Sequence, residues 1–122
     1  VKAQTVTVEL PAHAADAEAL AEGFALGSYR YTRYRTTPPD PTPEVTYAGE
    51  ADVSRALVLA EATALARDFV NRSPDEKLAP EMADLFASAA RDAGVEAEVW
   101  DEKRLADEGF GGLLGVARGS MD

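Results

Sequence analysis

The sequence offers few side chains that could bind a metal or carry out acid–base or nucleophilic chemistry. His13 is the single histidine among 122 residues, and Asp16 follows it at helical spacing. This pair makes half of a metal site, since a tightly held ion needs three or four convergent ligands. No Ser-His-Asp set can be built around one histidine, and no carboxylate pair stands out among 22 acidic residues. We therefore predict a surface position for His13, and the residues alone indicate no active site.

A glycine-rich run near the end of the chain could be taken for a phosphate-binding loop. A dinucleotide-binding loop needs G-x-G-x-x-G between a strand and a helix, whereas here position 114 is Leu and the run follows a predicted helix. No G-K-[ST] motif for a nucleoside triphosphate is present either. We predict instead a helix stop followed by a strand that packs close to a neighbour. The glycines concerned are Gly109, Gly111, Gly112, Gly115 and Gly119.

Aromatic and basic residues alternate in "YRYTRYR", a pattern that resembles a stacking surface for single-stranded nucleic acid. The chain, however, carries 22 acidic against 12 basic residues and a net charge of -10. This balance disfavours nucleic acid and anionic membranes as partners, because both require a basic surface. We therefore expect Tyr29, Tyr31 and Tyr34 to pack against a neighbouring domain, with the arginine side chains exposed.

Two further classes of protein are excluded by composition. The sequence has no cysteine, which rules out a disulfide framework, a thiolate nucleophile and a Cys-ligated metal. No apolar run approaches the roughly 20 residues that a membrane-spanning helix requires, so we expect no membrane partner. We expect a cytoplasmic protein, and because the first residue is Val1 we expect an inner segment of a longer chain.

The elements that must position these residues begin with a strand. Residues 4–10 alternate apolar and polar side chains, and we expect this strand to have unpaired edges on both sides. A helix is predicted over 14–31, where Gly23 and Gly27 could allow close packing against a neighbour. Four prolines among the nine residues "TTPPDPTPE" then predict an extended, exposed segment, and "VTYAG" after it a short edge strand.

The residues from Asp52 to Asn71 are strongly helical, and Asp52 or Ser54 can cap the first turn. We expect one apolar stripe on this helix to exceed what the short unit after it can cover. The chain should then self-associate, by strand addition at the first strand or by helix pairing, and Leu65→Glu should give a monomer or unfold it. The stripe comprises Leu57, Val58, Ala62, Leu65, Ala66, Phe69 and Val70.

The last part of the chain is predicted to alternate between helices and strands. A helix begins at Pro80 and stops at Gly94, and "VEAEVW" then reads as a strand. Asp101 can cap a short helix "EKRLADE", and the apolar "GGLLGVARG" reads as a second strand. This order predicts an α/β fold with crossover connections.

Two blocks of sequence resemble a known family. "ARDFVNRSPDEKLAPEMADLFASAARDAGVEAEVWDEKRLADEGFGGLLGVARGS" is similar to the opening of the catalytic region of cytosolic leucyl aminopeptidases. Members carry a helix ending in a V-N-x-P turn, an L-T-P-E helix start and then a DEKxLxxxGxGxLLxVxxGS run. Upstream, "AEGFALGSYRYTRYRT" is similar to the last helix of the family's N-terminal domain.

The resemblance implies a domain plan for the chain. Residues 1–36 would be the strand-helix tail of an N-terminal α/β domain, and 37–50 a proline-rich linker. Residues 51–72 would be a bridging helix, and 73–122 the first helix-strand-helix-strand unit of an α/β catalytic domain. The competing hypothesis is a non-catalytic α/β binding or assembly module that shares this pattern.

The resemblance also implies a function for the longer protein. Enzymes of this family release N-terminal, leucine-like residues from peptides with two divalent metal ions, Mn or Zn, and are typically hexamers. Their metal ligands and catalytic Lys and Arg lie in motifs downstream of the "GS" at Gly119 and Ser120. None of these has a counterpart here, so we assign no catalytic, cofactor-binding or metal-binding residue. We expect the 122-residue chain alone to be inactive and to bind no metal ion.

Overall fold

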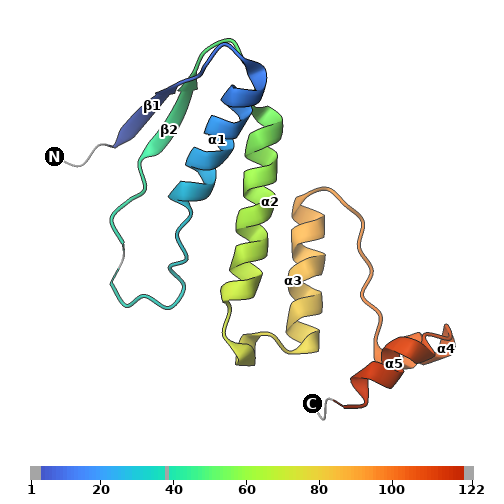
Figure 1. Cartoon of the computed structure of the whole chain (residues 1–122). Helices are drawn as coiled ribbons and strands as arrows, with labels where there is room; N and C mark the ends of the chain where they lie inside the picture. Colours follow the sequence, from blue (N-terminus) through green and yellow to red (C-terminus); the bar gives the residue numbers. More distant parts are fainter. Residues whose placement is uncertain (1–3, 38, 120–122) are drawn as a thin grey trace. The chain divides into compact units, whose positions relative to one another are not determined.

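The computed structural model describes residues 4–37 and 39–119, and within these ranges two strands and five α-helices form an α/β arrangement (Figure 1). The fold class is therefore the one predicted from the sequence. The elements in chain order are β1 (Thr5–Glu9), α1 (Ala14–Ser28), β2 (Glu44–Ala48), α2 (Ser54–Asn71), a 3-10 turn (Pro74–Glu76), α3 (Ala79–Asp92), α4 (Glu102–Asp107) and α5 (Gly111–Ala117).

The chain divides into two units, Val1–Asn71 and Arg72–Asp122, which are described separately. The proline-rich segment leads from α1 to β2 and so lies inside the first unit. The domain assignments of residues 1–36, 37–50, 51–72 and 73–122 remain predictions. In the described part of the chain, none of the helices has the length and apolar character needed to span a membrane.

In the first unit β1 and β2 form a parallel pair, with Thr7 beside Thr46 in the register. Parallel neighbours require a crossover connection. α1 supplies it, because it runs back against the direction of the two strands between β1 and β2 (Figure 1). Val8 is buried, whereas the adjacent residue Thr7, whose side chain points to the other face of the sheet, is exposed. Both predicted strands are confirmed, but the expectation of two free edges on β1 is wrong, because β2 covers one of them.

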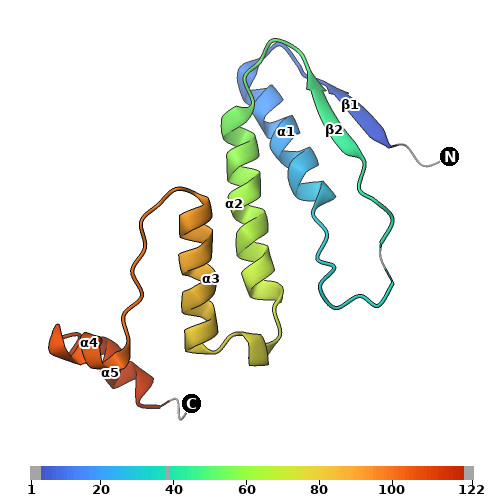
Figure 2. The ribbon, with the colours of Figure 1, turned by 180° about the vertical axis from the view of Figure 1, so that it is seen from behind.

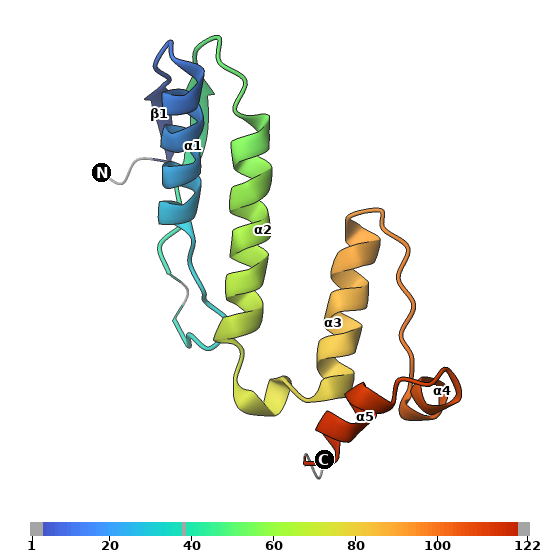
Figure 3. The same ribbon diagram turned by 45° about the vertical axis from the view of Figure 1, so that its right-hand side comes forward.

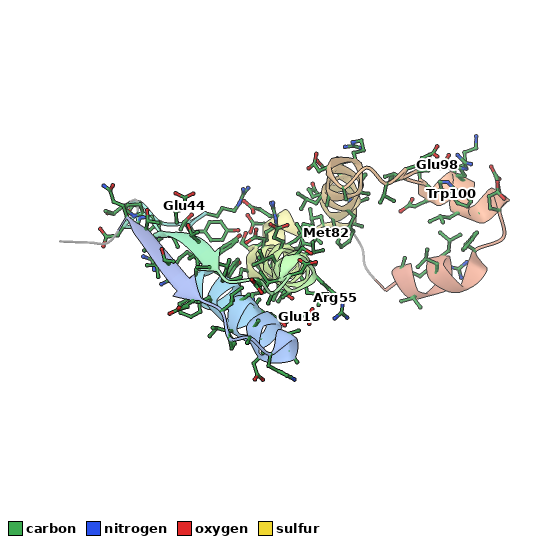
Figure 4. All side chains as sticks on the ribbon, turned by 90° about the horizontal axis from the view of Figure 1, so that it is seen from above. Glu18, Glu44, Arg55, Met82, Glu98 and Trp100 are labelled. Carbon is green, nitrogen blue, oxygen red and sulfur yellow. The ribbon has the colours of Figure 1, made fainter. Side chains whose placement is uncertain are left out.

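Small side chains join α1 and α2, which lie side by side (Figure 3). Ala17 and Ala21 of α1 are 0% exposed and Ala56 of α2 is 2% exposed, and Val53 completes this cluster. Alanine allows the two backbones to approach closely, near the short end of the usual 8–10 Å between helix axes. At the edge of the contact Arg55 of α2 and Glu18 of α1 lie 3.9 Å apart (Figure 4).

The apolar stripe predicted on α2 is not the face that the first unit buries. Leu65 is 43% exposed, Val58 63% and Val70 73%. The buried face is rotated toward Ala56 and Ala60, because α1 presents alanines there and close approach excludes larger residues. The predicted capping of this helix is confirmed for Asp52, whose carboxylate accepts the backbone N–H of Ser54 at 2.9 Å.

Two strands predicted in the second unit are wrong. Residues 95–100 are extended, yet they form no ladder with any strand in the described ranges, and a strand exists only through such pairing. "GGLLGVARG" contains the helix α5, because a short apolar run fits a helix as well as a strand by periodicity. The predicted helices at 80–94 and 102–108 are confirmed as α3 and α4.

In the first unit the helix predicted over 14–31 ends earlier, at Ser28, where Tyr29 turns to an extended backbone.

Candidate functional site

His13 and Asp16 lie together, as their spacing predicts, but they remain a surface pair. The His13 Nδ1 to Asp16 Oδ2 distance is 3.5 Å, and the two side chains are 74% and 73% exposed. His13 stands at the N-cap of α1 without a side-chain capping bond. No group of three or more His, Cys, Asp or Glu side chains that could hold a metal comes together in the described residues. The pair therefore has no third ligand within that part of the chain.

The glycines near the end of the chain do not form a phosphate loop. Gly109 has a φ of 80° just after α4, which is the left-handed conformation that glycine adopts most easily at a helix end. The predicted helix stop is therefore confirmed. Gly111, Gly112 and Gly115 lie within α5, and a Cβ added at any of them would meet no atom within 4 Å. The prediction that this run packs close to a neighbour is thus wrong for these three positions.

Tyr29 joins the C-terminal ends of α1 and α2. Its hydroxyl donates to Asp68 Oδ1 at 2.7 Å and accepts from Asn71 Nδ2 at 3.2 Å. The guanidinium of Arg67 lies 5.5 Å from the Tyr29 ring centroid and donates to the carbonyl of Leu26 at 3.2 Å. Desolvation, followed by the bond to Asp68, raises the pKa of the Tyr29 hydroxyl above its ordinary value. This cluster connects the ends of two helices, and Arg67 lies over the Tyr29 ring where a stacked base would have to bind.

The rest of the "YRYTRYR" segment also makes contacts within the chain. Arg30 Nη1 donates to the carbonyls of Gly27 at 3.2 Å and Tyr29 at 3.1 Å. Arg30 thus supplies hydrogen bonds to exposed backbone acceptors at the end of α1. Tyr31 and Tyr34 meet edge to face, with ring centroids 5.8 Å apart. These contacts all lie within the first unit, so the predicted packing of the three tyrosines against a neighbouring domain stays a prediction.

A second aromatic cluster surrounds Trp100 in the other unit. Phe110 meets the Trp100 ring edge to face at 5.7 Å, and the guanidinium of Arg104 lies 4.5 Å from the ring centroid. Arg104 also pairs with Glu98, which lies close to Trp100 (Figure 4). A hydrogen bond from the Trp100 side chain, followed by Arg104, holds the pKa of Glu98 below its ordinary value. Sequence reasoning missed this cluster, although Trp100 and Arg104 stand four residues apart around the cap at Asp101.

Trp100 and Glu98 of this cluster also line a groove of about 500 Å³. The extended segment 95–100 runs back along α3 (Figures 1 and 3). The alanines on the facing side of α3 are small and leave space between the helix and this segment. Its lining includes Ala83, Ala87, Ala90, Trp100 and Leu113. The lining is apolar apart from Glu98, so it provides no set of convergent polar groups for catalysis.

A larger groove of about 560 Å³ lies in the first unit, between the sheet and α1. Val6 and Val45 come from the two strands, and Gly23, Phe24 and Gly27 come from the second half of α1. None of the described residues that line this groove is charged. Such a surface suits an apolar protein segment better than a polar substrate. Neither groove contains a nucleophile paired with a base, so the geometry assigns no active site to the described residues.

Comparison with known proteins gives matches to two domains of one family. The sequence model described as "Cytosol aminopeptidase family, N-terminal domain" matches residues 1–38, and the one described as "Cytosol aminopeptidase family, catalytic domain" matches residues 64–122. The α/β chain therefore carries parts of two successive domains of one class of peptidase. It belongs to the cytosol aminopeptidase family.

Curated relatives agree with this assignment. A protein named "Probable cytosol aminopeptidase" from Leifsonia xyli subsp. xyli is 39% identical, over 96% of this chain and 26% of its own length. Proteins of the same name from Rhodococcus opacus and Nocardia farcinica are 37% and 39% identical, each over 86% of this chain and 24% and 23% of their own lengths. The chain thus spans about a quarter of the length of the curated relatives it matches. No solved structure matches the chain significantly.

Proposed function

We propose that the whole protein containing this chain is a cytoplasmic, metal-dependent aminopeptidase that releases leucine-like N-terminal residues from peptides. The observation that carries the proposal is the ordered match to an N-terminal domain and then a catalytic domain of one peptidase family. The names of the curated relatives support the same reaction class. The alternative, a non-catalytic binding or assembly module, is supported by no comparable observation.

The metal centre of such an enzyme does not fit the residues described here. Two divalent ions, Mn or Zn, need several converging carboxylate or imidazole ligands. The described residues bring no three such side chains together, and the His13–Asp16 pair is highly exposed. We therefore derive no catalytic step from this chain. In the proposal, the catalytic machinery belongs to the part of the protein that the relatives have beyond the matched quarter.

The test is an assay of the whole protein beside the 122-residue chain. Purified whole protein should release leucine from leucinamide when supplied with Mn or Zn, and a chelator should abolish the release. A leucine peptide with an acetylated amino terminus is the matched control, and it should stay intact because an aminopeptidase requires the free amine. The 122-residue chain should release nothing with either metal. Absence of metal-stimulated release by the whole protein would refute the proposal, and release by the chain alone would refute its stated inactivity.

The assembly of the whole protein is part of the same proposal. Hexamers are typical of the family that the sequence resembles, so we propose a homo-hexamer. Mass photometry of the purified whole protein should show one species of six subunits. A monomer or dimer that retains full activity would contradict this part of the proposal and leave the proposed reaction intact.

A further inference from the structure

The boundary between the two family matches does not coincide with the boundary between the two units. The match to the catalytic domain begins at residue 64, inside α2, whereas the first unit continues to Asn71. The final residues of α2 therefore carry catalytic-domain sequence and pack as part of the first unit. Tyr29, in contrast, lies within the N-terminal domain match, which covers residues 1–38. Contacts between Tyr29 and the end of α2 thus connect sequences of the two domains.

These contacts continue the alanine contact between α1 and α2. The two helices run side by side in the same direction, so their C-terminal ends lie together (Figures 1 and 2). Ala17 and Ala56, which share the buried cluster near the start of the helices, are 39 residues apart in the sequence. Tyr29 and Asp68, which meet at the far end, are also 39 residues apart. One register over about three helical turns indicates a single interface between the helices.

The end of α1 is completed by a side chain from α2. The last carbonyls of a helix have no partner within it, and they carry a partial negative charge. α1, all of whose residues are described, has no basic residue in its last turn. Arg67 supplies a positive charge from α2, because its Nη1 donates to the carbonyl of Leu26 at 3.2 Å. Arg67 lies in the catalytic-domain match, so catalytic-domain sequence stabilises a helix end of the N-terminal domain.

The end of α2 is stabilised by Tyr29 in return. Asp68 lies in the last turn of α2, where a carboxylate meets the partial negative charge of the helix end and disfavours the helix. The Tyr29 hydroxyl donates to this carboxylate at 2.7 Å, which offsets that cost. Asp68 and Asn71 are three residues apart and so share one face of α2, and the same hydroxyl bonds to both. The local helix therefore disfavours Asp68, whereas the contact with Tyr29 favours it.

The Tyr29 ring takes part in the same contact as its hydroxyl. The guanidinium of Arg67 lies 5.5 Å from the ring centroid, within the range of a cation–π attraction. We propose that the Tyr29 cluster, defined as Tyr29, Arg67, Asp68 and Asn71, anchors the first residues of the catalytic domain to the N-terminal domain in the whole protein. Each domain then stabilises a helix end of the other. The anchor depends on the two domain matches and not on the proposed peptidase reaction.

Hydrogen exchange of the whole protein, followed by mass spectrometry, tests the anchor from the N-terminal side. Tyr29→Phe keeps the ring and removes both bonds of the hydroxyl, so the backbone amides of residues 65–71 should exchange about tenfold faster. The matched control is Tyr47→Phe, which also removes one hydroxyl but breaks a bond to Ala21 in the middle of α1. It should leave the exchange of residues 65–71 unchanged.

The same measurement tests the anchor from the catalytic side. Arg67→Met removes the donor to Leu26, so the amides in the last turn of α1 should exchange about fivefold faster. Arg55→Met is the control, because Arg55 also faces α1 from α2 but pairs with Glu18, far from that turn. Its exchange there should match that of the unmodified protein.

Three results would each overturn the anchor: unchanged exchange at the end of α2 in Tyr29→Phe, an equal increase there in Tyr47→Phe, or unchanged exchange at the end of α1 in Arg67→Met. If Tyr29→Phe fails to fold, Arg67→Met and its control decide alone. Exchange is measured without substrate or added metal. Failure of the anchor therefore leaves the proposed peptidase reaction intact, and failure of that reaction leaves the anchor intact.

Discussion

Tyr29 shows how one hydroxyl can hold two helix ends together. It bonds at once to Asp68 and Asn71, both in the last turn of α2, while Arg67 covers its ring. Tyr47 of β2 connects the sheet to α1 in a similar way, because its hydroxyl donates to the carbonyl of Ala21 at 3.2 Å. Both hydroxyls must stay protonated to donate these bonds. The contact between α1, α2 and the sheet therefore depends on two neutral tyrosines.

This dependence predicts a loss of stability in alkali. Desolvation and the bond to Asp68 raise the pKa of Tyr29, and burial raises that of Tyr47. Because the folded-state pKa lies above the unfolded value of about 10, the unfolded chain loses its protons first. The contribution of these groups is complete below pH about 10 and is lost as the pH rises through the folded-state pKa values. Urea unfolding followed between neutral pH and pH about 11 should show this fall.

Phenylalanine variants connect the fall to the two residues. The double variant Tyr29→Phe and Tyr47→Phe should have a lower unfolding midpoint than the parent at neutral pH, by up to about 5 °C for each lost hydroxyl. It should also lose much of the alkaline dependence, since neither ring can then ionise. A double variant that loses stability above pH about 10 as steeply as the parent would show that other groups control the transition.

At the scale of elements, the contact between α1 and α2 depends on the small size of alanine. Ala21 is 0% exposed, so a larger side chain there must push the helices apart or distort. Ala21→Leu should lower the free energy of unfolding by about 1–3 kcal/mol. Ala62→Leu is the matched control, because Ala62 is exposed on another face of α2 and should change stability by less than about 0.5 kcal/mol. Equal effects of the two changes in urea titrations would mean that the alanine contact is loosely packed.

The same contact explains what the sequence could and could not predict. The positions of β1, β2 and four helices follow from alternation, periodicity and caps, and the Asp101 carboxylate does accept the N–H of Arg104 at 2.8 Å. The buried face of α2 does not follow, because hydrophobicity ranks leucine above alanine while close helix packing selects alanine. The strand predicted at 95–100 is wrong for another reason, since strand formation depends on a partner that local sequence does not specify.

The candidate functional residues could be predicted from the sequence only in part. The residue inventory predicts no catalytic or metal site, because one histidine and no cysteine leave few ligand sets, and this stays a prediction. The Tyr29 cluster joins residues about forty positions apart, and spacing along the chain gives no sign of that contact. The Trp100 cluster is local, and a cation four residues from an aromatic ring beside a helix cap was its available signal.

At the scale of the whole molecule, the distribution of acidic residues decides how the chain should treat metal ions. It carries 22 acidic residues, but they are spread over the surface and no three of those described converge with each other or with His13. A scattered set binds divalent ions only weakly and without fixed stoichiometry, because each ion keeps most of its water. Family membership alone would suggest the opposite, since the proposed reaction of the whole protein requires two metal ions.

Calorimetric titration of the 122-residue chain with Mn²⁺ and with Zn²⁺ distinguishes the two expectations. We expect no saturable binding in the micromolar range or tighter, because His13 and Asp16 offer two exposed ligands where a tight site needs three or four. Any weak Zn²⁺ signal should disappear in His13→Ala and persist in a control such as Glu61→Gln, on the exposed surface of α2. Tight binding of one or two ions per chain, insensitive to His13→Ala, would show a metal site that neither the residue inventory nor the described geometry contains.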